Sequence, residues 1–296
     1  MLSILLSGIS DCAYALAAGM LLAAYWLDGP EMTLARPAFS SVTAFRWLIG
    51  VGVVMTITQS MRPWFLAASM SGASRFRENL DLVPSILSST HQGLLWKLNM
   101  SAMLALIAVV AWMLRRRTRT TYLAAVICLC IVAFVKAASS HAGDDGDFTR
   151  LEMVQWLHIL ATAIWGGGVI VSGLIVLPAL TRTAANATMR QYVQRLSMVA
   201  TYAVITVLGA GIYSADREIA GPITSLSSSN WGKILIVKIT VVFLALILGA
   251  FNRFICLGTD VTEEKITLSC RLLWIEAVAI LAVFCLSGWL GNTAPE

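Results

Sequence analysis

Residues 151–178 read LEMVQWLHILATAIWGGGVIVSGLIVLP, and Glu152 is the single charged side chain among them. A helix needs about 20 mostly apolar residues to cross the hydrocarbon core of a bilayer. This stretch is therefore long enough to span a membrane, and Pro178 is placed to end it.

Polar and aromatic side chains follow one face of this predicted helix. The residues on this face are Leu151, Gln155, His158, Thr162 and Trp165, which follow one another at spacings of four, three, four and three. Gly166, Gly167 and Gly168 come next, and their lack of side chains lets another helix approach closely. A polar stripe beside a patch of small residues is typical of a buried, functional helix face.

The whole chain has the composition of a membrane protein. It has 296 residues, of which 58% are hydrophobic and 12% charged, about half the charge of soluble domains. We expect an all-α polytopic bundle, one integral membrane domain over residues 1–296. About eight transmembrane helices are predicted, over residues 3–27, 40–66, 91–114, 121–141, 151–178, 191–214, 231–256 and 267–291.

A faint internal repeat relates the two halves of the chain. Ile9 through Gly19 can be laid on Trp156 through Gly166, and Ser89 through Gly93 on Ser228 through Gly232. Four helices per half would give two halves of the same orientation, a possible 4+4 parallel repeat. The N-terminal half would be residues 1–140 and the C-terminal half residues 141–296.

The net charge of +5 reports topology rather than nucleic-acid binding. Basic residues gather in cytoplasmic loops, and Arg115, Arg116, Arg117 and Arg119 lie between two apolar runs. With this cluster inside, both termini lie outside. The six cysteines contain no CxxC pair, so a disulfide framework or a zinc knuckle is not expected.

The three histidines, His91, His141 and His158, all fall on the outer side in this topology. Imidazole is a ligand for copper, zinc and iron, so the three are candidate metal ligands. The alternative is that His91 and His141 are interfacial caps and that His158 bonds a neighbouring helix. The repeat puts Asp11 at the level of His158, where it could be a metal ligand, a proton acceptor or a partner of a lysine.

Two further pairs stand out in the predicted helices. Lys238 and Glu276 lie deep, where unpaired charges are costly, so we expect a structural ion pair, with a proton relay as the alternative. Met100 and Met103 are i, i+3 on one helix and are possible soft ligands for Cu(I). Methionine is also ordinary packing material.

Several stretches resemble the CopD/PcoD copper-resistance membrane proteins. They are Ser140–Ala142, Val154–Leu160, Ile164–Gly168, Ser229–Lys238 and Gly249–Arg253, followed by Arg271 and Glu276. The resemblance is clearest over residues 135–295, and His141 and His158 match its motif positions. It implies a bacterial inner-membrane protein of copper uptake or handling. It also implies a periplasmic CopC-like copper-binding partner, here a separate chain.

The leading hypothesis is therefore copper transport across the inner membrane, with the metal bound near the periplasmic face and no catalytic residue expected. One alternative is a membrane electron carrier in which His141 and His158 hold a b-type haem. Another is a membrane redox or assembly factor for copper. The transport hypothesis has a weak point, because the sequence shows no ladder of ligands toward the cytoplasmic side.

Overall fold

The computed structural model describes residues 2–29, 39–72, 80–143, 146–181, 186–218, 229–256 and 263–290. These residues form helices and turns without a strand, and they include 8 helices long and apolar enough to cross a membrane. The all-α polytopic bundle predicted from the composition is confirmed, and every predicted span coincides with one of these helices.

The helices follow one another along the chain with short connections. In order they are α1 (Leu2–Leu27), α3 (Ser41–Ser60), α4 (Arg62–Ser71), α6 (Val83–Ser89), α7 (His91–Met113), α8 (Arg119–Ala138), α9 (Arg150–Thr162), α10 (Gly168–Val171), α11 (Leu177–Leu180), α12 (Asn186–Glu218), α13 (Asn230–Phe251) and α14 (Glu263–Leu290). The second span is broken at Met61, and Pro63 lies in the first turn of α4, where its missing N–H costs no helical bond.

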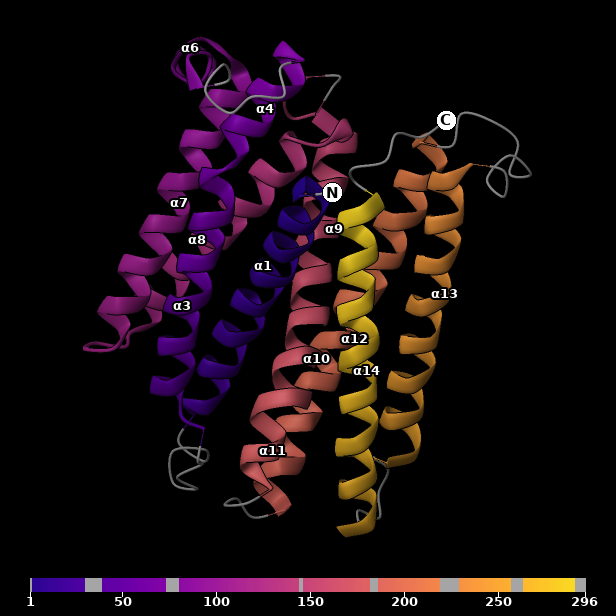
Figure 1. Ribbon diagram of the computed structural model, residues 1–296. Helices are drawn as coiled ribbons and strands as arrows, with labels where there is room; N and C mark the ends of the chain where they lie inside the picture. The colour runs from indigo at the N-terminus through magenta and orange to yellow at the C-terminus, as the bar shows by residue number, and fades with distance from the viewer. Residues whose placement is uncertain are drawn as a thin grey trace.

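Two groups of helices flank a central pair (Figure 1). The central pair is α1 and the helix that runs from α9 through α10 to α11. The last helix of each half packs on the first helix of the other half: α8 contacts α9, and α14 contacts α1. Within the halves α1 contacts α3, α9 contacts α12, α7 contacts α8, and α13 contacts α14. The correspondence between the halves is incomplete, because α3 also contacts α7 whereas α12 and α13 make no comparable contact among the described residues.

Matching helix starts support the same relation between the halves. Thr90 is the N-cap of α7, and its Oγ1 accepts a bond of 3.0 Å from the Gly93 N–H. Ser229 is the N-cap of α13, and its Oγ accepts a bond of 3.0 Å from the Gly232 N–H. Both caps satisfy a backbone donor that the helix cannot satisfy itself. They fall in the two segments that the repeat aligned.

The central pair crosses at glycines. A Cβ placed on Gly19 would lie 2.1 Å from the carbonyl oxygen of Gly167. A Cβ placed on Gly167 would lie 1.8 Å from the carbonyl oxygen of Ala15. The two backbones are therefore in direct contact, and no side chain fits between them. This is the close approach that the run of three glycines predicted.

The helix 150–180 is not a regular α-helix. It widens into π-helical turns at η2 (Ala163–Gly167) and at η3 (Ser172–Val176). A π turn shifts the register of the following side chains, and such turns are frequent at functional sites. A continuous helix was predicted over residues 151–178 and neither π turn was, because apolar periodicity does not reveal a single inserted residue.

The backbone contact at Gly167 can be tested through the thermal stability of the protein. Gly167→Ala should lower the midpoint of thermal unfolding in detergent, because overpacking of this kind costs about 1–3 kcal/mol. Gly209→Ala is the matched control, since a Cβ there meets nothing within 4 Å. Circular dichroism of both variants measures the midpoints. Equal midpoints for the two variants would contradict the backbone contact.

Candidate functional site

Polar side chains gather toward one end of the bundle, where α7, α9 and α13 begin and where α8 ends. We call it the histidine end. His91 is the first residue of α7, His141 begins a short 3-10 turn after α8 (η1, His141–Gly143), and His158 is in the third turn of α9. The prediction that the three histidines share one side of the bundle agrees with this chain path.

His158 faces α12. Its ring lies 3.6 Å from a Cβ built on Gly211 and makes a hydrogen-bonding contact with the backbone of Val207. Its Nδ1 is buried and has no hydrogen-bond partner among the described residues. Buried polar atoms without a partner are rare and call for an explanation. A ligand or an ordered water would complete the bonding of this atom.

The surroundings of His158 add two groups. Thr162 follows it by one helical turn, and the Thr162 Oγ1 is also buried without a partner among the described residues. Lys238 of α13 lies close enough to interact electrostatically with the ring. His158, at the centre of the polar face predicted for the fifth helix, thus lies against α12, with Lys238 of α13 within electrostatic reach.

His91 lies at the surface of the histidine end. Its Nε2 is 3.2 Å from the Asp147 carboxylate, and the two side chains are 49% and 51% exposed. A carboxylate on one ring nitrogen orients the imidazole and leaves the other nitrogen available. Asp147 belongs to the acidic segment between α8 and α9, whose Asp144 and Asp145 lie outside the described residues.

His141 is located by its backbone alone. It begins the η1 turn between α8 and α9, and its side chain lies outside the described residues. The turn is tied to the start of α9 because the Thr149 hydroxyl donates to the Ala142 carbonyl over 3.4 Å.

Asp11 of α1 forms an ion pair with Lys136 of α8, at 2.5 Å between its Oδ1 and the lysine Nζ. The two side chains keep exposures of 26% and 15%. Arg62 of α4 also interacts electrostatically with Asp11 and donates over 3.4 Å to the Ser139 carbonyl. Of the roles considered for Asp11, the structure shows the lysine partner.

Four further polar residues on α1, α3 and α7 were not predicted as site residues: Ser10, Gln59, Trp96 and Asn99. The Gln59 amide donates to the Ser10 hydroxyl over 3.2 Å, and the Trp96 indole donates to the Gln59 carbonyl over 2.8 Å. Asn99 is 1% exposed, and its Oδ1 has no partner among the described residues. Asn99 follows its N-cap Thr90 by as many residues as Lys238 follows Ser229, so the repeat could have indicated it.

Glu276 lies deeper, near the middle of α14, and is 4% exposed. The Trp165 indole is hydrogen-bonded to its carboxylate, and a Cβ on Gly249 would lie 3.0 Å from its Oε1. Three residues of the stretches that carried the family resemblance thus meet from three different helices. Among the described residues, the ion pairs within 4 Å are those of Asp11, Asp28 and His91, and a Lys238–Glu276 pair is not one of them.

Buried polar atoms continue from Glu276 toward the opposite end. Ser269 lies two turns before Glu276 on α14, and Asn252 follows α13 in a π turn (η5, Asn252–Cys256). Both are buried, and the Ser269 Oγ and the Asn252 Oδ1 lack partners among the described residues. At that end the Arg253 guanidinium donates to the Ser197 and Thr201 hydroxyls of α12.

The two methionines differ in position. Met103 is 1% exposed and belongs to the apolar core, whereas Met100 is half-buried. Within the described residues, no group of three or more His, Cys, Asp and Glu side chains is placed to hold a metal ion. The candidate ligands His91, His158 and Asp11 therefore belong to three separate clusters at the histidine end.

Two protein families match parts of the chain. Residues 1–151 match the family described as "Copper resistance protein D-like, N-terminal domain", and residues 190–290 match "Copper resistance protein D". The resemblance is therefore not confined to the C-terminal half, where the motifs were clearer. Residues 152–189, which include His158, lie between the two matches.

A curated relative gives the same result. The chain is 20% identical to the copper resistance protein D of Pseudomonas syringae pv. tomato over 274 residues, which are 86% of this chain and 86% of the relative. No solved structure matches the chain. With eight apolar helices, one match over half of the chain and a second over most of the rest, the chain belongs to the copper resistance protein D family.

Proposed function

We propose that the protein transports copper across the bacterial inner membrane, with the histidine end on the periplasmic side. The observation that carries the proposal is His158, an intramembrane imidazole whose buried Nδ1 has no partner among the described residues. Imidazole is a good copper ligand, and ionisable residues inside a membrane mark substrate pathways. The family to which the chain belongs is named for copper resistance.

The proposed route begins at His91 and Asp147. Their exposed pair presents one free imidazole nitrogen and a negative charge to the solvent, which favours the approach of a cation. Copper then passes to His158, which is the deeper site. We propose that each of these sites holds the ion through few ligands, so that it can be passed on.

Protons accompany this movement in our proposal. Lys238 carries a positive charge beside His158, so a copper ion at His158 and a proton on Lys238 repel each other. Glu276 is buried, and its hydrogen-bond donor Trp165 is neutral. Further toward the opposite end, Asn252 and Ser269 each place a buried oxygen atom without a partner among the described residues. Oxygen atoms suit protons and water better than they suit soft copper. We therefore assign the inner half of the path to a proton relay through Glu276.

A separate periplasmic CopC-like protein would deliver the metal at the histidine end. The short helices α4 and α6 and the turn before α9 lie there and expose apolar side chains, among them Met61, Met70, Leu82 and Phe148. Exposed apolar groups of this kind at a membrane surface suit a protein contact.

The first experiment tests His158. His158→Ala should abolish copper-dependent accumulation in cells while membrane insertion is kept, because the intramembrane ligand is lost. Thr206→Ala on α12 is the control, since its exposed hydroxyl bonds only to Tyr202 of its own helix among the described residues. Copper per cell is measured by elemental analysis. Unchanged accumulation in His158→Ala would refute the assigned role.

Metal analysis of the purified protein separates the proposal from the haem alternative. The protein loaded with copper should lose metal when His91, His141 or His158 is replaced by Ala. A Soret band in the absorption spectrum of the purified protein would instead establish haem and contradict the copper role of these histidines.

Variants of the Asp11–Lys136 pair distinguish a structural role of Asp11 from a role in copper transport. Asp11→Asn leaves Lys136 with less compensation and should destabilise the protein by about 2 kcal/mol, below the 3–5 kcal/mol of fully buried pairs because both side chains are partly exposed. The double variant Asp11→Asn/Lys136→Met should recover most of that stability. If it also recovers copper accumulation, Asp11 is a structural partner of Lys136; a stable but inactive double variant makes Asp11 part of the metal route.

A further inference from the structure

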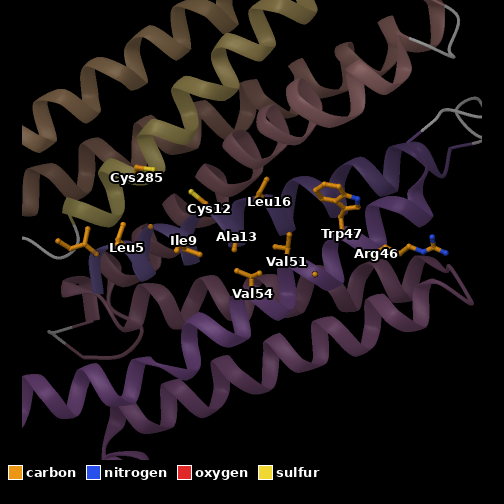
Figure 2. A pocket seen from close by; sticks show the side chains of 13 residues that line it. Leu5, Ile9, Cys12, Ala13, Leu16, Arg46, Trp47, Val51, Val54 and Cys285 are labelled. Carbon is orange, nitrogen blue, oxygen red and sulfur yellow. The ribbon is translucent and has the colours of Figure 1, made fainter. Parts of the chain in front are cut away.

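A groove on the membrane-facing side of the bundle contains two cysteines. Helices α1, α3 and α14 enclose about 740 Å³, and the lining includes Cys12 of α1 and Cys285 of α14 (Figure 2). Leu5, Ile9 and Val54 line it and are exposed, so the groove opens toward the lipid. Both cysteines are free thiols.

The crossing of α1 and α14 brings the two thiols together. A Cβ on Gly288 would lie 2.7 Å from the Cα of Gly8, so the two backbones touch at this point. The helices run in opposite directions, because α1 begins and α14 ends at the histidine end. About one turn further along, Cys12 therefore faces Cys285, and the two thiols are in hydrogen-bonding contact.

We propose that Cys12 and Cys285 form a two-thiolate site for Cu(I). The site deepens the copper function proposed above and rests on it. Thiolates are soft ligands that select Cu(I) among the metals available to cells. Zinc and iron–sulfur sites need about four such ligands, and no third His, Cys, Asp or Glu completes a cluster in the described part of the chain. Cu(I), a d10 ion, accepts two ligands in line.

The geometry suits such an ion. Two metal–sulfur bonds of about 2.3 Å in line place the sulfur atoms about 4.6 Å apart, a small opening from thiols in hydrogen-bonding contact. Cys285 is exposed to the groove, so its side chain has room to make this change. On binding, both thiols lose their protons, and Cu⁺ with two thiolates gives a complex of charge −1 and two released protons.

The charges nearest the thiols belong to the Asp11–Lys136 pair. Cys12 interacts electrostatically with both, and the effect of the Asp11 carboxylate on it is larger than that of the Lys136 ammonium. An anion in an apolar groove is costly, and this pair does not lower the cost. The loss of the two thiol protons must therefore be driven by the copper–sulfur bonds themselves.

The test is Cu(I) binding by the purified full chain in detergent, without oxygen and with the metal supplied from a colorimetric Cu(I) chelator. Cys12→Ser and Cys285→Ser should each lose the same one equivalent of Cu(I). Cys270→Ser, another half-buried free cysteine, is the matched control and should lose none. X-ray absorption of the wild-type complex at the copper edge should show two sulfur neighbours, and this signal should persist in His158→Ala.

A second readout needs no variant. Bound Cu(I) should protect Cys285 from alkylation by a maleimide and leave the reactivity of Cys270 unchanged. If copper binds but no sulfur neighbour is seen and both serine variants keep full stoichiometry, the dithiolate site is refuted while the histidine route stands. If the sulfur signal is present and His158→Ala still accumulates copper, the histidine route fails and the dithiolate site stands.

Discussion

The contact between α1 and the helix 150–180 is the constraint on which the rest of the bundle depends. Gly19 and Gly167 meet backbone to backbone, which brings the first helices of the two halves closer than any side chain would allow. The last helix of each half then packs on the central helix of the other half, α14 on α1 and α8 on α9. In lipid, where apolar side chains gain little by leaving the solvent, such close packing is a main source of helix association.

The same contact positions the polar residues. Asp11 lies two turns before Gly19 and His158 about two turns before Gly167, so the crossing holds both at a similar height toward the histidine end. At the crossing itself, the π turn at Ala163–Gly167 contains Trp165, whose indole is hydrogen-bonded to Glu276 of α14. The half of the bundle at the histidine end thus holds the imidazoles and the Asp11–Lys136 pair, and the opposite half holds the buried Ser269 and Asn252 and the Arg117–Asp28 pair. This difference in polar groups is the reason for proposing a copper route and a proton relay in different halves.

The sequence indicated most of the residues of the site, but it did not indicate which residues contact one another. His91, His158, Asp11, Lys238 and Glu276 stood out because ionisable groups are costly inside a membrane. Their partners were Asp147, the backbone of α12, Lys136, His158 and Trp165. Of these, a lysine for Asp11 and a neighbouring helix for His158 had been considered, and neither was specified. Partners come from helices distant in sequence, and helical periodicity gives a face but not the neighbour of that face. The same limit hid Asn99 and Gln59, which are polar without charge.

The sequence by itself determined that the chain crosses the membrane about eight times, that the run Gly166–Gly168 is a site of close helix contact, and that the histidines share one end. These conclusions follow from length, hydropathy and spacing, which act within one helix or one loop. The tertiary structure alone decided that Gly167 meets Ala15 and Gly19, that Glu276 sits against Gly249, and that Cys12 faces Cys285. Those pairs depend on the angle and register at which helices cross, and crossing geometry is the sum of many small packing contacts that no single stretch of sequence contains.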